Sequence, residues 1–120
     1  MLKHRPHIET GKQGEQLAVK FITSKEYILL EQNWRFKNCE VDIIAHKENT
    51  LHFFEVKTRH NVQQLLPEQS VTNKKMSKLK EAAQEYLYQN PQWKFLQFNI
   101  IAITLKRNAD PEIFLIEDVY

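Results

Sequence analysis

Several features that would define common classes of protein are scarce or absent in this sequence. The single cysteine, Cys39, excludes an internal disulfide and a zinc site built from several cysteines. The only two glycines are Gly11 and Gly14, and they form neither a Walker loop nor a dinucleotide-binding fingerprint. No apolar run is long enough to cross a membrane, and no signal-type segment opens the chain, so we expect a soluble, cytoplasmic protein.

What is present indicates one folded domain spanning residues 1–120. Hydrophobic residues make up 42% of the 120 positions, which is enough for a core. The net charge of +2 is compatible with nucleic-acid binding but does not by itself indicate it. The five histidines show no paired spacing of the kind that binds metals, and no Ser–His–Asp order is evident.

Residues 38–45 and 51–59 alternate polar and apolar side chains with the period of a β-strand, and a polar tetrad separates them. This pattern predicts a hairpin. If His46 pairs with Leu51, Asp42 lies opposite Glu55 and Glu40 lies opposite Lys57. By the same alternation Glu40, Asp42 and Ile44 share one face, and Val41 and Ile43 share the other.

Carboxylates placed opposite each other on hydrophobic strands are unfavourable unless a cation lies between them. Mg²⁺ and Mn²⁺ prefer oxygen ligands, so we predict a site for either ion with Asp42 and Glu55 as direct ligands, helped by the carbonyl of Val56. Lys57 would position or activate an attacking water, and Glu40 would be an ion-pair partner or outer ligand. The predicted chemistry is hydrolysis of a phosphodiester; the alternative is an exposed, solvated charged face.

The N-terminal region predicts a loose arm over residues 1–9 and a helix over residues 10–25, with Thr10 as its N-cap. Gly14 leaves room for close approach of backbone or ligand. Glu15 lies at the edge of the apolar stripe of this helix. It is either a surface residue or a side chain that leans toward the acidic face and binds a second ion or orients a water.

The rest of the chain predicts a strand over residues 27–36, a loop over residues 63–72, a helix over residues 73–88 capped by Thr72, and strands over residues 95–105 and 113–116. The expected element order is α-β-β-β-α-β-β, an α/β arrangement. Basic residues cluster near the acidic hairpin and at the start of the second helix. They are either solvated or candidates for binding DNA phosphates, and they comprise Arg35, Lys57, Arg59, Lys74, Lys75 and Lys78.

These residues occur in motifs that resemble the bacterial YraN-type family, which is related to Holliday junction resolvases and to the PD-(D/E)xK nucleases. The resemblance runs from Gly11 to about Leu105. The matching motifs are Gly11-x-x-Gly14-Glu15, Leu30-x-x-Asn33-Trp34-Arg35, Glu40-Val41-Asp42-Ile43-Ile44-Ala45, Phe54-Glu55-Val56-Lys57-Thr58-Arg59 and Pro67-Glu68-x-x-Val71.

The resemblance implies a restriction endonuclease-like fold, with a central mixed sheet flanked by helices. It also implies that Glu15, Asp42, Glu55 and Lys57 form a catalytic set. Two departures stand out: Cys39 replaces a glycine that the family usually has before its Glu-Ile-Asp motif, and the turn after the first helix lacks a glycine.

The sequence therefore predicts a metal-dependent endonuclease-like protein that acts on DNA, with branched or repair intermediates among its candidate substrates. A homodimer would enlarge the surface that so small a domain offers to such a substrate. Two alternatives stay open at this stage. One is a DNA-binding or protein-binding accessory module that keeps the fold without turnover, and the other is a structural domain whose acidic face is only solvated.

Overall fold

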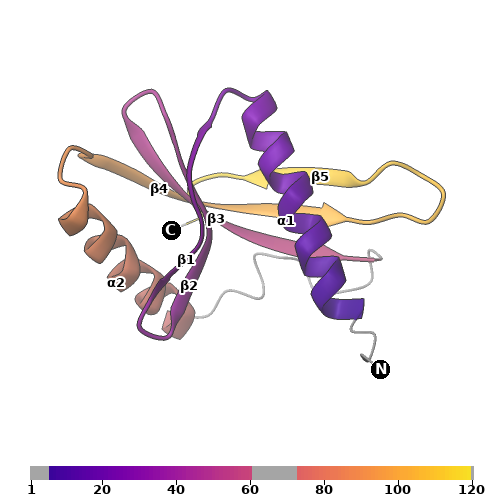
Figure 1. Ribbon diagram of the computed structural model, residues 1–120, viewed down its shortest axis with the longest axis horizontal. Helices are drawn as coiled ribbons and strands as arrows, with labels where there is room; N and C mark the ends of the chain where they lie inside the picture. Colours follow the sequence, from indigo (N-terminus) through magenta and orange to yellow (C-terminus); the bar gives the residue numbers. More distant parts are fainter. Residues whose placement is uncertain (1–5, 61–72, 120) are drawn as a thin grey trace.

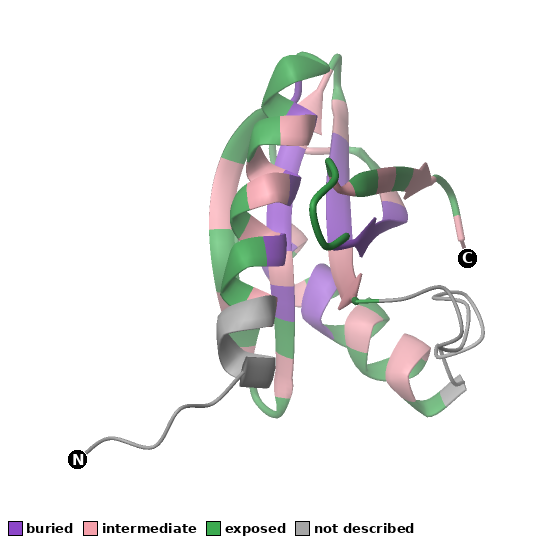
Figure 2. Ribbon diagram, turned by 90° about the vertical axis from the view of Figure 1, so that its right-hand side faces the viewer, coloured by how far each residue is buried: buried purple, intermediate pink, exposed green. Residues whose placement is uncertain are grey.

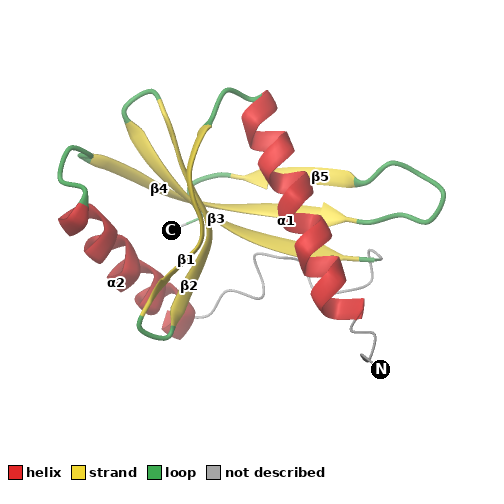
Figure 3. Ribbon diagram, in the orientation of Figure 1, coloured by secondary structure: helices red, strands yellow, loops and turns green. Residues whose placement is uncertain are grey.

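The computed structural model describes residues 6–60 and 73–119, which form five strands and two helices (Figure 1). The elements follow the expected order α-β-β-β-α-β-β, coloured by type in Figure 3. Their bounds are α1 Pro6–Ser24, β1 Ile28–Phe36, β2 Cys39–Lys47, β3 Thr50–Arg59, α2 Asn73–Gln89, β4 Phe95–Thr104 and β5 Glu112–Ile116. The predicted loop over residues 63–72, the Thr72 cap and the motif at residues 67–71 lie outside the described residues.

The five strands form one mixed sheet in the order β1-β2-β3-β4-β5. All neighbouring pairs are antiparallel except β3 and β4, which run parallel over their whole length. The parallel pair requires a crossover, and α2 lies in the connection between these two strands. The predicted α/β fold with a central mixed sheet is confirmed.

The two helices cover opposite faces of the sheet. Phe54 packs in a core cluster with Ala18 and Ile22 of α1, whereas its neighbour Phe53 packs in a second cluster with Ala83 of α2. Successive side chains of a strand point to opposite faces, so these contacts assign one helix to each face. Figure 2 shows the buried residues concentrated between the helices.

Helix α1 begins at Pro6, so the prediction of a loose arm through residue 9 and of Thr10 as the N-cap is wrong. Proline is favoured in the first turn of a helix because its missing N–H has no intrahelical partner there. At the other end, the Tyr27 amide bonds the Ile22 carbonyl and the Glu26 amide bonds the Thr23 carbonyl. These are the bonds of a Schellman motif, and Glu26 adopts the left-handed φ of 70° that a glycine would adopt more readily.

Gly14 brings α1 into close contact with β3. A Cβ atom built on Gly14 would lie 2.9 Å from the Cβ of Thr58, closer than real side chains approach. The other glycine of the helix, Gly11, has nothing within 4 Å of such an atom. Close packing at Gly14 therefore determines how near the following residue, Glu15, lies to the sheet.

The β2–β3 hairpin has the predicted register over its closed end, from Lys47 opposite Thr50 to Ile43 opposite Phe54. The ladder ends there, so the predicted pairs Asp42–Glu55 and Glu40–Lys57 do not form. The Asp42 carboxylate instead accepts a hydrogen bond from the Val56 amide at 2.8 Å. The Asp42 side chain thus takes the place of a backbone carbonyl as the acceptor for the Val56 amide.

The pleat is also interrupted on the β1 side of Asp42. Pairing of β1 with β2 omits Asn33, which has a left-handed φ of 52°. Val41 packs in the α2 cluster whereas Ile43 packs in the α1 cluster, contrary to the predicted shared face. Asp42 thereby lies at a bend in the sheet.

Within the described residues, neither helix is both long and apolar enough to cross a membrane.

Candidate functional site

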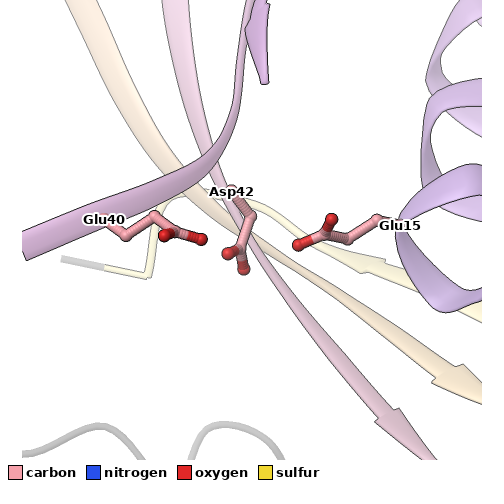
Figure 4. Close-up of side chains that lie close together, drawn as sticks. All are labelled: Glu15, Glu40 and Asp42. Atoms are coloured by element: carbon pink, nitrogen blue, oxygen red, sulfur yellow. The ribbon is translucent and has the colours of Figure 1, made fainter. Parts of the chain in front are cut away.

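Three carboxylates converge at the bend of β2. One oxygen each from Glu15 of α1 and from Glu40 and Asp42 of β2 lies within 4.8 Å of the others. Figure 4 shows the three side chains pointing toward one another, with Glu15 reaching from the helix. We call Glu15, Glu40 and Asp42 the acidic cluster. Glu15 thus extends toward the acidic residues of β2.

Asn33 bridges two members of the acidic cluster. Its side-chain nitrogen, oriented toward the carboxylates, donates to Glu15 at 3.1 Å and to Glu40 at 3.1 Å. The left-handed backbone of Asn33, which asparagine tolerates better than most residues, presents the amide in this position. No role for Asn33 was predicted from the sequence, although it lies in one of the motifs that carry the family resemblance.

Asp42 lies at the centre of the local electrostatics. Burial raises the pKa of its carboxyl to about 6, the Val56 hydrogen bond acts in the opposite direction, and Glu15, Glu55 and Glu40 add to the rise. Burial likewise raises the pKa of Glu15, opposed by Asn33 and reinforced by Glu40. Negative charge is therefore concentrated here beyond what the surrounding protein compensates.

Glu55 is engaged by ammonium groups and is not part of the acidic cluster. Its Oε1 lies 3.2 Å from Lys57 Nζ, and the same oxygen forms an ion pair with Lys75 of α2. Burial, followed by the neighbouring Lys75, lowers the pKa of Lys57. Burial lowers the pKa of Lys75, but its hydrogen bond to Glu55 outweighs burial, so the pKa of Lys75 is raised.

The prediction that Glu40 lies opposite Lys57 is wrong. Glu40 pairs with Arg35 across the β1–β2 ladder, and its carboxylate accepts from the Arg35 guanidinium at 2.9 Å. The bend at Asp42 turns Glu40 toward α1, whereas Glu55 contacts α2. Asp42 and Glu55, which were predicted to pair directly across the ladder, instead have different partners: Asp42 accepts from the Val56 amide, and Glu55 pairs with Lys57 and Lys75.

A pocket of about 300 Å³ nevertheless joins the two sets of charges. Its wall contains Glu40, Asp42 and Glu55 from the strands and Lys74, Lys75 and Lys78 from α2. Apolar contributions come from Val41, Phe54 and Leu79, and Cys39 and Asn38 complete the lining. Carboxylates and lysines therefore face one cavity between the first turns of α2 and the bend of β2.

The other basic residues that were predicted to bind DNA lie on α2, β1 and β3. Lys74 and Lys78 are exposed at the pocket, and Arg35 is exposed on β1. Arg59 is half-buried, and its Nε donates to Thr104 Oγ1 at 3.1 Å. The structure thus brings Lys74, Lys75 and Lys78 beside the acids, whereas Arg59 contacts the neighbouring strand β4.

The fold and the site together define a small α/β protein with a mixed sheet, helices on both faces and a carboxylate-lysine pocket. Residues 14–103 match the model of the family described as Uncharacterised protein family UPF0102. The chain belongs to this family.

Relatives match most of the chain. A UPF0102 protein of Chloroherpeton thalassium is 40% identical over 122 residues, covering 95% of each chain. One from Flavobacterium psychrophilum is 42% identical over 101 residues, covering 84% of this chain and 85% of its own. One from Christiangramia forsetii is 40% identical over 114 residues, covering 95% of each. These names identify the family and state no activity.

Proposed function

We propose that this protein is a divalent-cation-dependent endonuclease that hydrolyses phosphodiester bonds in DNA, with branched or repair intermediates as candidate substrates. The position of Asp42 carries the proposal. Its carboxylate belongs to the acidic cluster and also lines the pocket that holds Glu55 and the lysines of α2. A metal-binding group thus adjoins residues suited to a phosphate. The sequence resemblance to the YraN-type family supports the same function.

The acidic cluster fits Mg²⁺ or Mn²⁺ in its donor chemistry. Both ions prefer carboxylate oxygens, and three such oxygens lie within 4.8 Å of one another. The raised pKa of Asp42 reflects burial and crowding of negative charge, which a cation would relieve. Glu15, Glu40 and Asp42 would hold the ion, and Glu55 and the Val56 carbonyl remain candidate ligands. When bound, such an ion lowers the pKa of a coordinated water and neutralises charge on a phosphate.

Lys57 is the residue we assign to positioning the attacking water and stabilising charge on the phosphate. It is half-buried beside Glu55, and burial lowers its pKa, which makes proton exchange easier than for an exposed lysine. Gly14 supports the site by holding α1, and with it Glu15, against β3. The positive side chains near the pocket would bind the DNA backbone, namely Arg35, Lys57, Arg59, Lys74, Lys75 and Lys78.

The test is cleavage of linear, nicked, flapped and four-way DNA in Mn²⁺, Mg²⁺ or EDTA. We expect cleavage that requires the metal and falls at least about a hundredfold in Asp42→Asn and in Lys57→Ala. Glu48→Gln, in the exposed turn of the hairpin, is the matched control and should leave the rate unchanged. Cleavage that survives Asp42→Asn would identify a contaminating nuclease.

The second candidate is a DNA-binding accessory module without turnover. The observation that favours it is the engagement of Glu55 by Lys57 and Lys75, which gives this carboxylate ammonium partners without any metal. Salt-sensitive binding of the same DNA panel without cleavage in either metal would select this candidate and reject the enzyme.

A further inference from the structure

The Glu55 carboxylate joins two elements through its ammonium partners. Lys57 follows it on the same strand, whereas Lys75 reaches it from the first turn of α2. The Glu55 side chain is only 15% exposed, so its ion pairs are better shielded from water than most surface pairs. One oxygen, Oε1, serves both lysines. Two positive groups therefore share a single negative one at this end of the pocket.

At the other end of the pocket, around Asp42, negative groups are in excess. Asp42 lies close to Glu15 and Glu40, and the group that donates a hydrogen bond to it is the neutral amide of Val56. Glu40 has the exposed Arg35 as its partner. The pocket thus has a cation-rich end at Glu55 and an anion-rich end at Asp42, and both carboxylates line the same cavity.

A divalent cation that used Asp42 and Glu55 together would have to share Glu55 with Lys75. Cations that converge on one carboxylate repel each other, and the repulsion is strong where water is partly excluded. Lys57 lies two residues from Glu55 on the same strand, so its backbone stays beside the Glu55 carboxylate. Lys75 lies on a separate helix and can leave by rotation of its flexible side chain alone.

We propose, on the basis of the proposed function, that Lys75 competes with the divalent cation for Glu55. In the metal-free protein Lys75 pairs with Glu55 alongside Lys57. Metal loading at Asp42 and Glu55 breaks this ion pair, so Lys75 weakens the affinity of the site for metal. Lys75 thus affects metal binding indirectly, through its ion pair with Glu55.

The experiment is calorimetric titration of Mn²⁺ into the full chain and its variants without DNA. We expect Lys75→Gln to bind Mn²⁺ about fivefold more tightly, the upper range for loss of a partly shielded ion pair. Lys74→Gln removes the same charge from the adjacent pocket-lining residue and should change the affinity less than about twofold. Lys75→Arg keeps the ion pair and should resemble the unmodified protein.

A double-mutant cycle with Glu55→Gln isolates the contact. If Lys75 acts through Glu55, adding Lys75→Gln to Glu55→Gln leaves the lower affinity of Glu55→Gln unchanged. Equal affinities for Lys75→Gln and Lys74→Gln would overturn the role of Lys75 while leaving the metal site intact. Weaker binding by Lys75→Gln would overturn it as well. Absence of Mn²⁺ binding in every variant would instead reject the proposed function. Circular dichroism of each variant establishes that it is folded before titration.

Discussion

At the scale of single residues, the carboxylate of Asp42 experiences opposing influences. It accepts a hydrogen bond from the Val56 amide, and this bond favours the ionised form of the carboxylate. Burial and the nearby carboxylates of Glu15 and Glu40 disfavour the ionised form. Burial prevails, and the pKa rises to about 6. Such concentration of charge destabilises a fold without a cation and is therefore typical of functional sites.

Asp42→Asn should stabilise the protein in EDTA. A carboxyl whose pKa is raised on folding stabilises the fold fully only below its unfolded pKa, near the ordinary value of 3.8, and this contribution is lost as pH rises through about 6. We expect the substitution to raise the free energy of unfolding by about 1–3 kcal/mol at about pH 7.5, and by little at about pH 4. The side-chain oxygen of asparagine can still accept the hydrogen bond from the Val56 amide.

Urea unfolding of both proteins at the two pH values measures this difference. Glu48→Gln is the control for removal of a carboxylate from the exposed turn, and its effect should be small at both values. Destabilisation by Asp42→Asn near neutral pH would mean that the ionised carboxylate contributes more through its hydrogen bond than burial costs.

At the scale of elements, α1 and β3 hold the acidic cluster together through their contact at Gly14. An alanine in its place would bring a Cβ within 2.9 Å of the Thr58 Cβ, so the helix or the strand would have to move. We expect Gly14→Ala to lower the free energy of unfolding by about 1–3 kcal/mol, as overpacking does elsewhere. Displacement of α1 would also weaken Mn²⁺ binding through Glu15.

Gly11→Ala is the matched substitution, one turn earlier on the same helix and with open space around the added atom. It should raise stability by about 0.5–1 kcal/mol, because alanine loses less conformational entropy than glycine in a helix. Thermal unfolding of both variants provides the comparison. Equal effects of the two substitutions would show that Gly14 matters only for helix propensity.

The hairpin shows how far the sequence predicts an element and where prediction fails. Alternation and turn length were sufficient to pair His46 with Leu51 and to carry the register to Ile43 and Phe54. They could not reveal that the Asp42 side chain takes the Val56 amide, because this bond competes with the regular ladder. A period of two assumes an unbroken pleat, so it assigned Glu40 to the wrong partner.

Two contacts at the candidate site could not be predicted from the sequence. Glu15 and Asp42 were recognised from their positions on a helix edge and a strand. The bridging role of Asn33 depends on a left-handed backbone, and that of Lys75 depends on where α2 docks. Neither property is encoded in local periodicity. Lys75 was assigned to a basic cluster, but its contact with Glu55 required the tertiary structure.

At the scale of the whole molecule, the fold brings together groups from both faces of the sheet. Helix α1 contributes Glu15, the bend of β2 contributes Glu40 and Asp42, and α2 contributes the lysines that face them across the pocket. The element order followed from the sequence patterns, and the mixed sheet with helices on both faces followed from the family resemblance. The end of the β2–β3 ladder at Ile43 and Phe54 did not, and beyond it Asp42 and Glu55 take partners other than each other.

Binding of a divalent cation by the acidic cluster around Asp42 is the central claim, and calorimetric titration with Mn²⁺ tests it most directly. We predict saturable binding by the unmodified protein and a loss of at least about tenfold in affinity in Asp42→Asn, with Glu48→Gln unchanged. Equal affinities of the unmodified protein and Asp42→Asn, or no binding by either, would contradict it.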